Sequence, residues 1–140
     1  MRKWMALAAL VAVLVCMLVP SVSFTEDRAT VLLARTIFAL GRDESYETKL
    51  ALGTVVMNRV ENSWFSDNLG EVLEEQHQFP SGSRYDSDSL KAAHAVLSGE
   101  RALDSSALYY RPLNASEPWS SEHLVATVGG YAFYSGDGNL

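Results

Sequence analysis

Three acidic side chains stand close together between two apolar segments of this chain: Asp43, Glu44 and Glu47. A carboxylic acid that is partly removed from water holds its proton to a higher pH than usual, and can therefore act as a general acid near neutral pH. The polar segment from Gly41 to Ser45, called the elbow below, would place such a group at the edge of a core. The elbow is our first candidate for acid catalysis.

Other kinds of active site find little support. His77, His94 and His123 lie on separate segments, and neither an H-E-x-x-H motif nor a cysteine pair accompanies them. We therefore expect no metal site and no cofactor. Gly82-Ser83 does not follow a convincing strand, which argues against the serine chemistry of amidases and esterases.

Two amphipathic helices are predicted on either side of the elbow. Apolar residues recur at the spacing of one helical face, as Ala29, Leu33, Ile37 and Leu40 and then as Leu52, Val55, Val56 and Val60. We predict Thr25 as the N-cap of the first helix, with Glu26 and Asp27 in its opening turn, and Gly41 as its C-terminal stop. Ser45, supported by Glu47, is the predicted N-cap of the second.

The rest of the chain divides into a helical middle and a β-rich end. Helices are predicted over 68–76 and 88–98, the latter capped by Asp86 or Ser87, with a loop over 77–85 between them. Strands are predicted over 107–111 and 124–134, the second broken into a hairpin by Gly129-Gly130. This order predicts an α+β domain, a helical body with a small C-terminal antiparallel β-sheet.

The N-terminus has the pattern of a bacterial secretion signal. Two basic residues precede an apolar run from Met5 to Val19, and small residues suit cleavage after Ser23. Residues 1–23 are thus predicted as a signal peptide, with an uncleaved membrane anchor as the alternative, and residues 24–140 as one exported domain. Since Cys16 lies in the removed segment, the mature domain would have no disulfide.

The charge of the mature domain limits its partners. Removing Arg2 and Lys3 from the 11 basic side chains leaves 9 against 17 acidic ones, a formal net charge of −8. Nucleic acids and anionic membranes reward basic surfaces, so neither is an expected partner. Membrane association is expected only if the N-terminal segment stays uncleaved, and we expect a monomer.

Seven motifs occur in an order that resembles the SleB-type cell wall hydrolases, the spore cortex-lytic enzymes: LLAR, GRDESYE, ALGTVVMNRV, QFP, SLKAAHAVLSG, ALYYRP and ATVGGYAFY. The resemblance covers about residues 28–135. It implies a lysozyme-like fold, export, and cleavage of peptidoglycan glycan strands by a lytic transglycosylase or muramidase type of reaction, in wall or spore cortex remodelling during germination.

The chain departs from the family pattern at the elbow. The family reads A-E-A-R-G-E-P, with its first Glu as the expected catalytic acid, whereas this chain has Leu40 at that position and keeps only the second acidic position, as Glu44. Leucine cannot transfer a proton, and loss of general acid catalysis costs a factor of about 10² to 10⁴.

Three hypotheses follow for the elbow. Glu44 has taken over as the catalytic acid, helped by Asp43 or Glu47; or the chain is a catalytically inactive relative that binds peptidoglycan or regulates a partner. The third is misalignment, or an acid from elsewhere, with four candidates: Glu71, Glu74, Glu75 and Asp86. A membrane-anchored interaction protein remains an alternative if residues 5–22 are retained.

Aromatic and amide side chains are the candidates for substrate binding: Gln78, Tyr109, Tyr110 and Trp119, with Trp64 as a further aromatic. Aromatic rings can stack on sugars and hydroxyls can bond to them, yet core packing is an alternative for both tyrosines, and a core or rim position is the commoner role of a tryptophan in a domain of this size. Tyr109 and Tyr110 should point to opposite faces of their strand, one toward the core and one toward the cleft or solvent. Asn58 and Arg59, which match the family's NRV motif, are expected to form a buried polar clamp.

Overall fold

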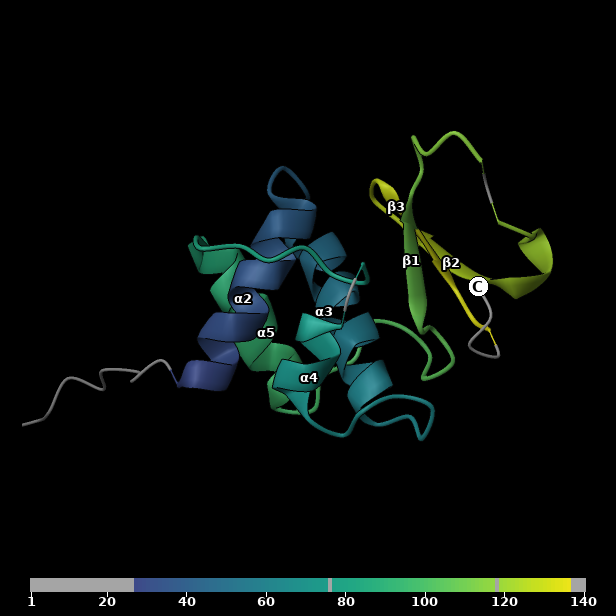
Figure 1. Cartoon of the computed structure of the whole chain (residues 1–140). Helices are drawn as coiled ribbons and strands as arrows, with labels where there is room; N and C mark the ends of the chain where they lie inside the picture. The colour runs from purple at the N-terminus through teal and green to yellow at the C-terminus, as the bar shows by residue number, and fades with distance from the viewer. Residues whose placement is uncertain (1–26, 76, 118, 137–140) are drawn as a thin grey trace, which may run out of the picture.

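Two helices meet at the elbow (Figure 1), in a computed structural model that describes residues 27–75, 77–117 and 119–136. Helix α2 (Arg28–Gly41) is capped by Asp27, whose Oδ1 accepts a hydrogen bond of 2.7 Å from the Thr30 N–H. The predicted Thr25 cap, outside the described residues, was wrong because Asp27 already satisfies this N–H. The predicted signal peptide also lies outside the described residues.

Helix α3 (Tyr46–Val60) leaves the elbow as predicted. Ser45 is its N-cap, and Ser45 Oγ accepts a hydrogen bond of 3.3 Å from the Thr48 N–H. Gly41 is the last residue of α2, also as predicted. A Cβ at Gly41 would lie 2.9 Å from Leu52 Cδ1, so the absence of a side chain lets α3 pack closely against the end of α2.

Two further helices complete the helical body, and both predictions are confirmed with small shifts of the boundaries. Helix α4 (Leu69–Glu74) is capped by Asn68 and helix α5 (Ser87–Leu97) by Asp86. Helices α2, α3 and α5 pack together around a fully buried apolar core, which includes Leu33, Ile37, Val56, Ala92, Ala93 and Val96. This packing fixes the directions in which α2 and α3 extend from the elbow.

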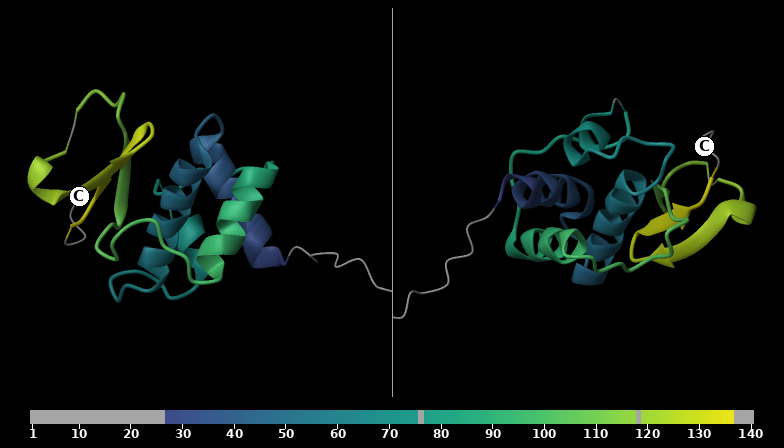
Figure 2. Two further views of the ribbon diagram at one scale, coloured as in Figure 1. Left: turned by 180° about the vertical axis from the view of Figure 1, so that it is seen from behind. Right: turned by 90° about the horizontal axis from the view of Figure 1, so that it is seen from below.

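A three-stranded antiparallel sheet lies to one side of the helices (Figures 1 and 2). Its strands are β1 (Tyr109–Pro112), β2 (Leu124–Val128) and β3 (Tyr131–Tyr134), in the order β1-β3-β2. The short 3₁₀ helix η1 (Ser121–His123) precedes β2. The Gly129-Gly130 hairpin is confirmed. Strand β1 begins two residues later than predicted, because the Ala107 N–H still closes a turn onto the Asp104 carbonyl.

Helix α3 joins the sheet to the helical body. Its residues Ala51, Leu52 and Val55 form a second buried cluster with Tyr131 and Phe133 of β3. This contact places the hairpin turn next to the elbow, although the two are far apart in sequence. Among the described residues, no helix has the length and apolar character that crossing a bilayer requires.

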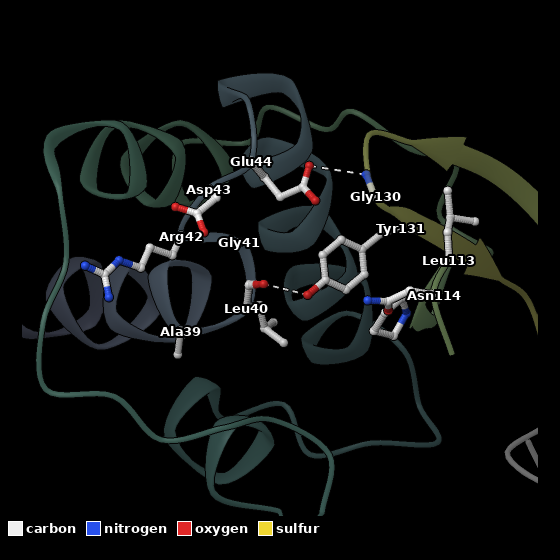
Figure 3. Close-up of a pocket in the computed structure, with 11 residues that line it drawn as sticks. Ala39, Leu40, Gly41, Arg42, Asp43, Glu44, Leu113, Asn114, Gly130 and Tyr131 are labelled. Carbon is white, nitrogen blue, oxygen red and sulfur yellow. Dashed lines mark hydrogen bonds between the residues drawn. The ribbon is translucent and has the colours of Figure 1, made fainter. Parts of the chain in front are cut away.

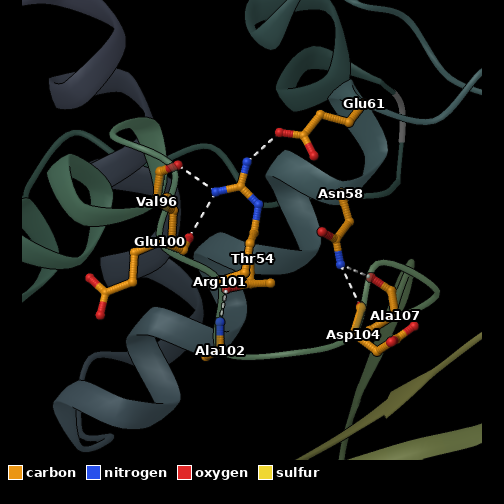
Figure 4. Close-up of polar contacts among 9 residues, drawn as sticks. All are labelled: Thr54, Asn58, Glu61, Val96, Glu100, Arg101, Ala102, Asp104 and Ala107. Carbon is orange, nitrogen blue, oxygen red and sulfur yellow. Dashed lines mark hydrogen bonds and ion pairs between the residues drawn. The ribbon is translucent and has the colours of Figure 1, made fainter.

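Polar side chains of α3 also anchor the connection from α5 to β1 (Figure 4). The Asn58 amide donates to the carbonyls of Asp104 at 2.9 Å and Ala107 at 3.0 Å, and Thr54 Oγ1 accepts a bond of 3.0 Å from the Ala102 N–H. Arg101 pairs with Glu61 at the end of α3. These bonds fix where β1 enters the sheet.

Candidate functional site

A cleft of about 560 Å³ lies between the elbow and the sheet (Figure 3). The end of α2 and the elbow form one wall, and the hairpin and the segment after β1 form the other. Its lining residues are Ala39, Leu40, Gly41, Arg42, Asp43, Glu44, Pro112, Leu113, Asn114, Gly130 and Tyr131. The cleft contains the predicted acid Glu44 and its predicted helper Asp43, but none of the four predicted substrate-binding residues, Gln78, Tyr109, Tyr110 and Trp119.

The Glu44 side chain is half-buried and bound to the hairpin. Its Oε2 accepts a hydrogen bond of 3.2 Å from the Gly130 N–H (Figure 3). No group in the described part of the chain donates a hydrogen bond to Oε1. One carboxylate oxygen is therefore held by a hydrogen bond from the hairpin, and the other accepts none from the described residues.

The two hairpin glycines make room for this carboxylate. A Cβ at Gly130 would lie 2.3 Å from Glu44 Oε1, and one at Gly129 would lie 2.6 Å from Glu44 Oε2 and 2.2 Å from Thr48 Oγ1. Gly129 also has a φ of +54°, which disfavours a side chain. The Gly-Gly pair thus forms the turn and also leaves space for the Glu44 carboxylate. The sequence indicated only the turn.

Tyr131 is a cleft residue that sequence analysis missed. Its hydroxyl donates a hydrogen bond of 2.5 Å to the Leu40 carbonyl, which joins β3 to the end of α2. Burial, with a contribution from the charge of Glu44, raises the pKa of Tyr131, so its hydroxyl remains a donor at neutral pH. All four residues of YAFY are buried, so neither residue type nor strand pattern gave a sign of this contact across the cleft.

Leu40 lines the cleft as well as the core. It is half-buried, packs against both helical and sheet clusters, and is one of the residues around the cleft. The position at which the resemblance expects the catalytic acid therefore faces the site, but it carries an apolar group.

Gln78 and Tyr110 lie outside the cleft lining; they bond to each other, and Gln78 also bonds to Arg59. The Arg59 Nη1 donates to Gln78 Oε1 at 3.0 Å, and the Tyr110 hydroxyl donates to the Gln78 carbonyl. Burial raises the pKa of Tyr110 to about 12. These contacts hold the 77–85 loop against β1.

Arg59 is the buried centre of this clamp, and the predicted structural role of Asn58 and Arg59 is confirmed. Only 1% of Arg59 is exposed, and its Nε donates to the Leu108 carbonyl at 2.6 Å. Its guanidinium lies 4.8–5.2 Å from the ring centroids of Phe65, Phe79 and Tyr109. Burial lowers the pKa of Arg59, and the ring faces stabilise the positive charge of its guanidinium.

Tyr109 and Trp119 pack together at a third cluster. Their rings meet edge to face with centroids 6.4 Å apart, and the Trp119 ring also meets Tyr134 at 5.1 Å. Tyr109 and Tyr110 take opposite faces of β1, as predicted, but neither lines the cleft, because each packs against a hydrophobic cluster. Trp64, 57% exposed, lines a separate depression with Glu71, Glu74 and Glu75.

Asp86, a candidate replacement acid, is committed elsewhere. It pairs with buried Lys49 at 3.0 Å and caps α5. Although burial raises its pKa, hydrogen bonds from Ser89 and Lys49 outweigh this effect and lower the pKa of Asp86 to about 2. A carboxyl group that is ionised down to such low pH is a poor proton donor. In the described ranges, no three acidic, histidine or cysteine side chains are grouped as a metal site requires.

Known proteins with similar sequences and structures identify the family and the fold of this chain. Residues 43–134 match the family described as Cell Wall Hydrolase. The chain is similar to the spore cortex-lytic enzymes of Bacillus subtilis, at 33% identity over 94 residues, and Oceanobacillus iheyensis, at 32% over 94 residues; each match covers 63% of this chain. These matches cover 31% and 34% of the relatives, so the chain spans about a third of their length.

Two solved structures have the same fold. The catalytic domain of the Bacillus cereus SleB protein matches with a TM-score of 0.68 at 20% identity, over 81% of this chain and 95% of that one. The catalytic domain of the germination-specific lytic transglycosylase SleB from Bacillus anthracis also matches with a TM-score of 0.68, at 21% identity, over 81% of this chain and all of that one. The predicted lysozyme-like α+β fold is therefore confirmed, and the chain belongs to the cell wall hydrolase family.

Proposed function

We propose that this chain binds the glycan strands of peptidoglycan in the elbow cleft and cleaves them, with Glu44 as the general acid. Family membership supports peptidoglycan as the substrate, and the names of the relatives support spore cortex as one form of it. The predicted signal over residues 1–23 would place this activity outside the cytoplasm.

The position of the Glu44 carboxylate carries the proposal. It is half-buried in the cleft, its Oε2 accepts a hydrogen bond from the Gly130 N–H, and its Oε1 accepts none from the described residues. A carboxyl group in this position would protonate the glycosidic oxygen as positive charge develops on the sugar ring. A lytic transglycosylase needs one such acid, because the C6 hydroxyl of the substrate closes an anhydro ring. For hydrolysis, Asp43 is the second carboxylate among the lining residues.

A second function is favoured by Leu40, a glycan-binding or regulatory role without catalysis. The Leu40 side chain lines the cleft where the family resemblance expects the acid. A cleft of this kind can still hold a glycan strand, because sugar recognition needs hydrogen bonds and apolar contact but no proton transfer.

Digestion of purified sacculi distinguishes the two functions. Vegetative wall and spore cortex are incubated with the purified chain and with the Glu44→Gln and Leu40→Glu variants, and soluble fragments are identified by mass spectrometry. Glu47, the other helper suggested by the sequence, is exposed on the first turn of α3 and does not line the cleft, so the Glu47→Gln variant is the control.

Each outcome assigns a function. If the wild type and Glu47→Gln release fragments and Glu44→Gln does not, Glu44 is the acid, and 1,6-anhydro ends mark the lytic reaction. If the wild type is silent and Leu40→Glu releases fragments, the natural role is binding or regulation. Release by Glu44→Gln at the wild-type rate would contradict the proposed role of Glu44.

A further inference from the structure

A second, smaller groove continues the cleft over the end of helix α2. It has a volume of about 230 Å³, and its lining residues are Phe38, Ala39, Arg42, Gly82, Ser83 and Arg84. Ala39 and Arg42 line the cleft as well. A polymer lying in the cleft would therefore meet this groove on the side of α2 next to the 77–85 loop.

Gly82 allows the loop to form the outer wall of the groove. A Cβ at this position would lie 3.0 Å from the Arg35 carbonyl oxygen and 3.3 Å from Ala39 Cβ. Such contacts are tight, so a glycine lets the loop backbone lie directly on α2. The next residues, Ser83 and Arg84, are thereby brought beside Arg42, although they follow it by 41 and 42 positions in the sequence.

The groove is basic in a chain with a net charge of −6. Arg42 and Arg84 are both exposed, and no acidic residue is among the lining residues. The ion pairs within the described ranges are Lys49–Asp86 and Arg101–Glu61, so neither groove arginine has a carboxylate partner there. Arg42 lies over the Phe38 ring, 5.7 Å from its centroid, and points away from the hairpin (Figure 3).

We propose that this groove is a subsite for a carboxylate carried by the glycan strand, bound by Arg42 and Arg84. The inference rests on the proposed function and adds a requirement for negative charge on the substrate. Guanidinium groups match carboxylates in geometry and charge. In peptidoglycan, the lactyl carboxyl group of muramic acid is either free, and then ionised, or linked through an amide bond to a stem peptide. The stem peptide carries carboxylates of its own. N-acetylglucosamine carries none.

Exposed arginines on a helix are common and by themselves indicate only a solvated surface. Here, two arginines from different segments share a groove that continues the cleft, and neither forms an ion pair with an acidic residue in the described part of the chain. This combination fits an anionic ligand better than it fits a neutral one.

Binding measurements in the Glu44→Gln background, which prevents cleavage, test the subsite. The ligands are peptide-free glycan oligomers with free lactyl carboxylates, the same oligomers after conversion of the carboxylates to neutral amides, peptide-bearing oligomers, and chitohexaose. The proteins carry Arg42→Gln, Arg84→Gln or both. The control is Arg28→Gln, a change of equal charge at the other end of α2, about 21 Å from Arg42 at about 1.5 Å per residue.

We expect each groove substitution to weaken binding of carboxylated oligomers by about two- to fivefold. The double substitution should remove most of the salt dependence of this affinity. Binding of amidated oligomers and chitohexaose, and the affinity of Arg28→Gln, should not change. Loss of affinity for the peptide-free oligomers identifies the lactyl carboxylate as the ligand group. Loss confined to peptide-bearing oligomers identifies the stem carboxylates.

Two results would overturn the inference in distinguishable ways. If the parent protein binds carboxylated and amidated oligomers equally and the double variant is unchanged, the subsite is wrong while glycan binding stands. If the parent protein binds none of the oligomers, the proposed function is also wrong.

Discussion

The Glu44 carboxylate accepts a hydrogen bond from the Gly130 N–H, at 3.2 Å and across 86 positions of sequence. This bond joins the elbow between α2 and α3 to the turn between β2 and β3. Both walls of the cleft meet at this point, so the position of the candidate acid depends on the hairpin as much as on the helices.

Substitution of a hairpin glycine should therefore impair the site more than the fold. In Gly129→Ala, the new Cβ would collide with Glu44 Oε2 and Thr48 Oγ1, and the turn would be strained by its positive φ. We expect glycan cleavage or binding to fall at least about tenfold, a change that displacement of one positioned group can produce.

The control for this change is Gly99→Ala. Gly99 also has a positive φ, +108°, but no atom lies within 4 Å of a Cβ there. Both variants should lose about 1 kcal/mol of unfolding free energy from backbone strain, and Gly99→Ala should keep full function. Equal function in the two variants would show that the Glu44 contact does not matter.

Replacing Arg59 should destabilise the whole domain. Arg59→Met keeps much of the side-chain length but loses the bonds to the Leu108 carbonyl and Gln78 Oε1 and the contacts with three aromatic rings. We expect a loss of about 2–4 kcal/mol in unfolding free energy by urea titration, since a buried carbonyl is left without its donor. Arg28→Met, at an exposed position, should change the same quantity by less than about 0.5 kcal/mol.

The Lys49–Asp86 pair predicts a loss of stability in acid. The pKa of Asp86 is lowered to about 2 from the ordinary value of 3.8, so its contribution is complete above about pH 4 and disappears as the pH falls toward 2. Asp86→Asn can still cap α5, but it lacks the charge. Its unfolding free energy should therefore be lower than that of the wild type at pH 6, and the difference should shrink between pH 4 and pH 2. A constant difference over this range would exclude the ion pair as the cause.

Removing the Tyr131 hydroxyl should loosen the end of α2. Tyr131→Phe leaves the Leu40 carbonyl without its donor, at an expected cost of about 1 kcal/mol in unfolding free energy. Function should decrease as well, because this bond joins the two walls of the cleft. Tyr134→Phe serves as the control, since no hydrogen bond of the Tyr134 hydroxyl occurs among the described contacts and its ring packs against Trp119. Equal effects of the two variants would contradict a special role for the bond.

Sequence alone determined the features that depend on neighbours along the chain. Apolar spacing located the helices on both sides of the elbow, Ser45 marked the start of α3, and Gly129-Gly130 marked the hairpin. These features follow from contacts three or four residues apart and from the backbone freedom of glycine. The order of the motifs also indicated the family and the lysozyme-like α+β fold.

Tertiary structure decided which side chains form the cleft. Tyr131 and the hairpin meet the elbow only because α3 packs against β3, and no local pattern encodes a contact across that interface. Gln78, Tyr109 and Tyr110 have residue types suited to binding sugars, but they are used inside the domain. Arg59 bonds to Gln78 and lies over the Tyr109 ring, and Tyr110 bonds to the Gln78 carbonyl. The sequence shows the chemistry of each side chain. Its neighbours, and therefore its role, are fixed by packing between segments that are distant along the chain.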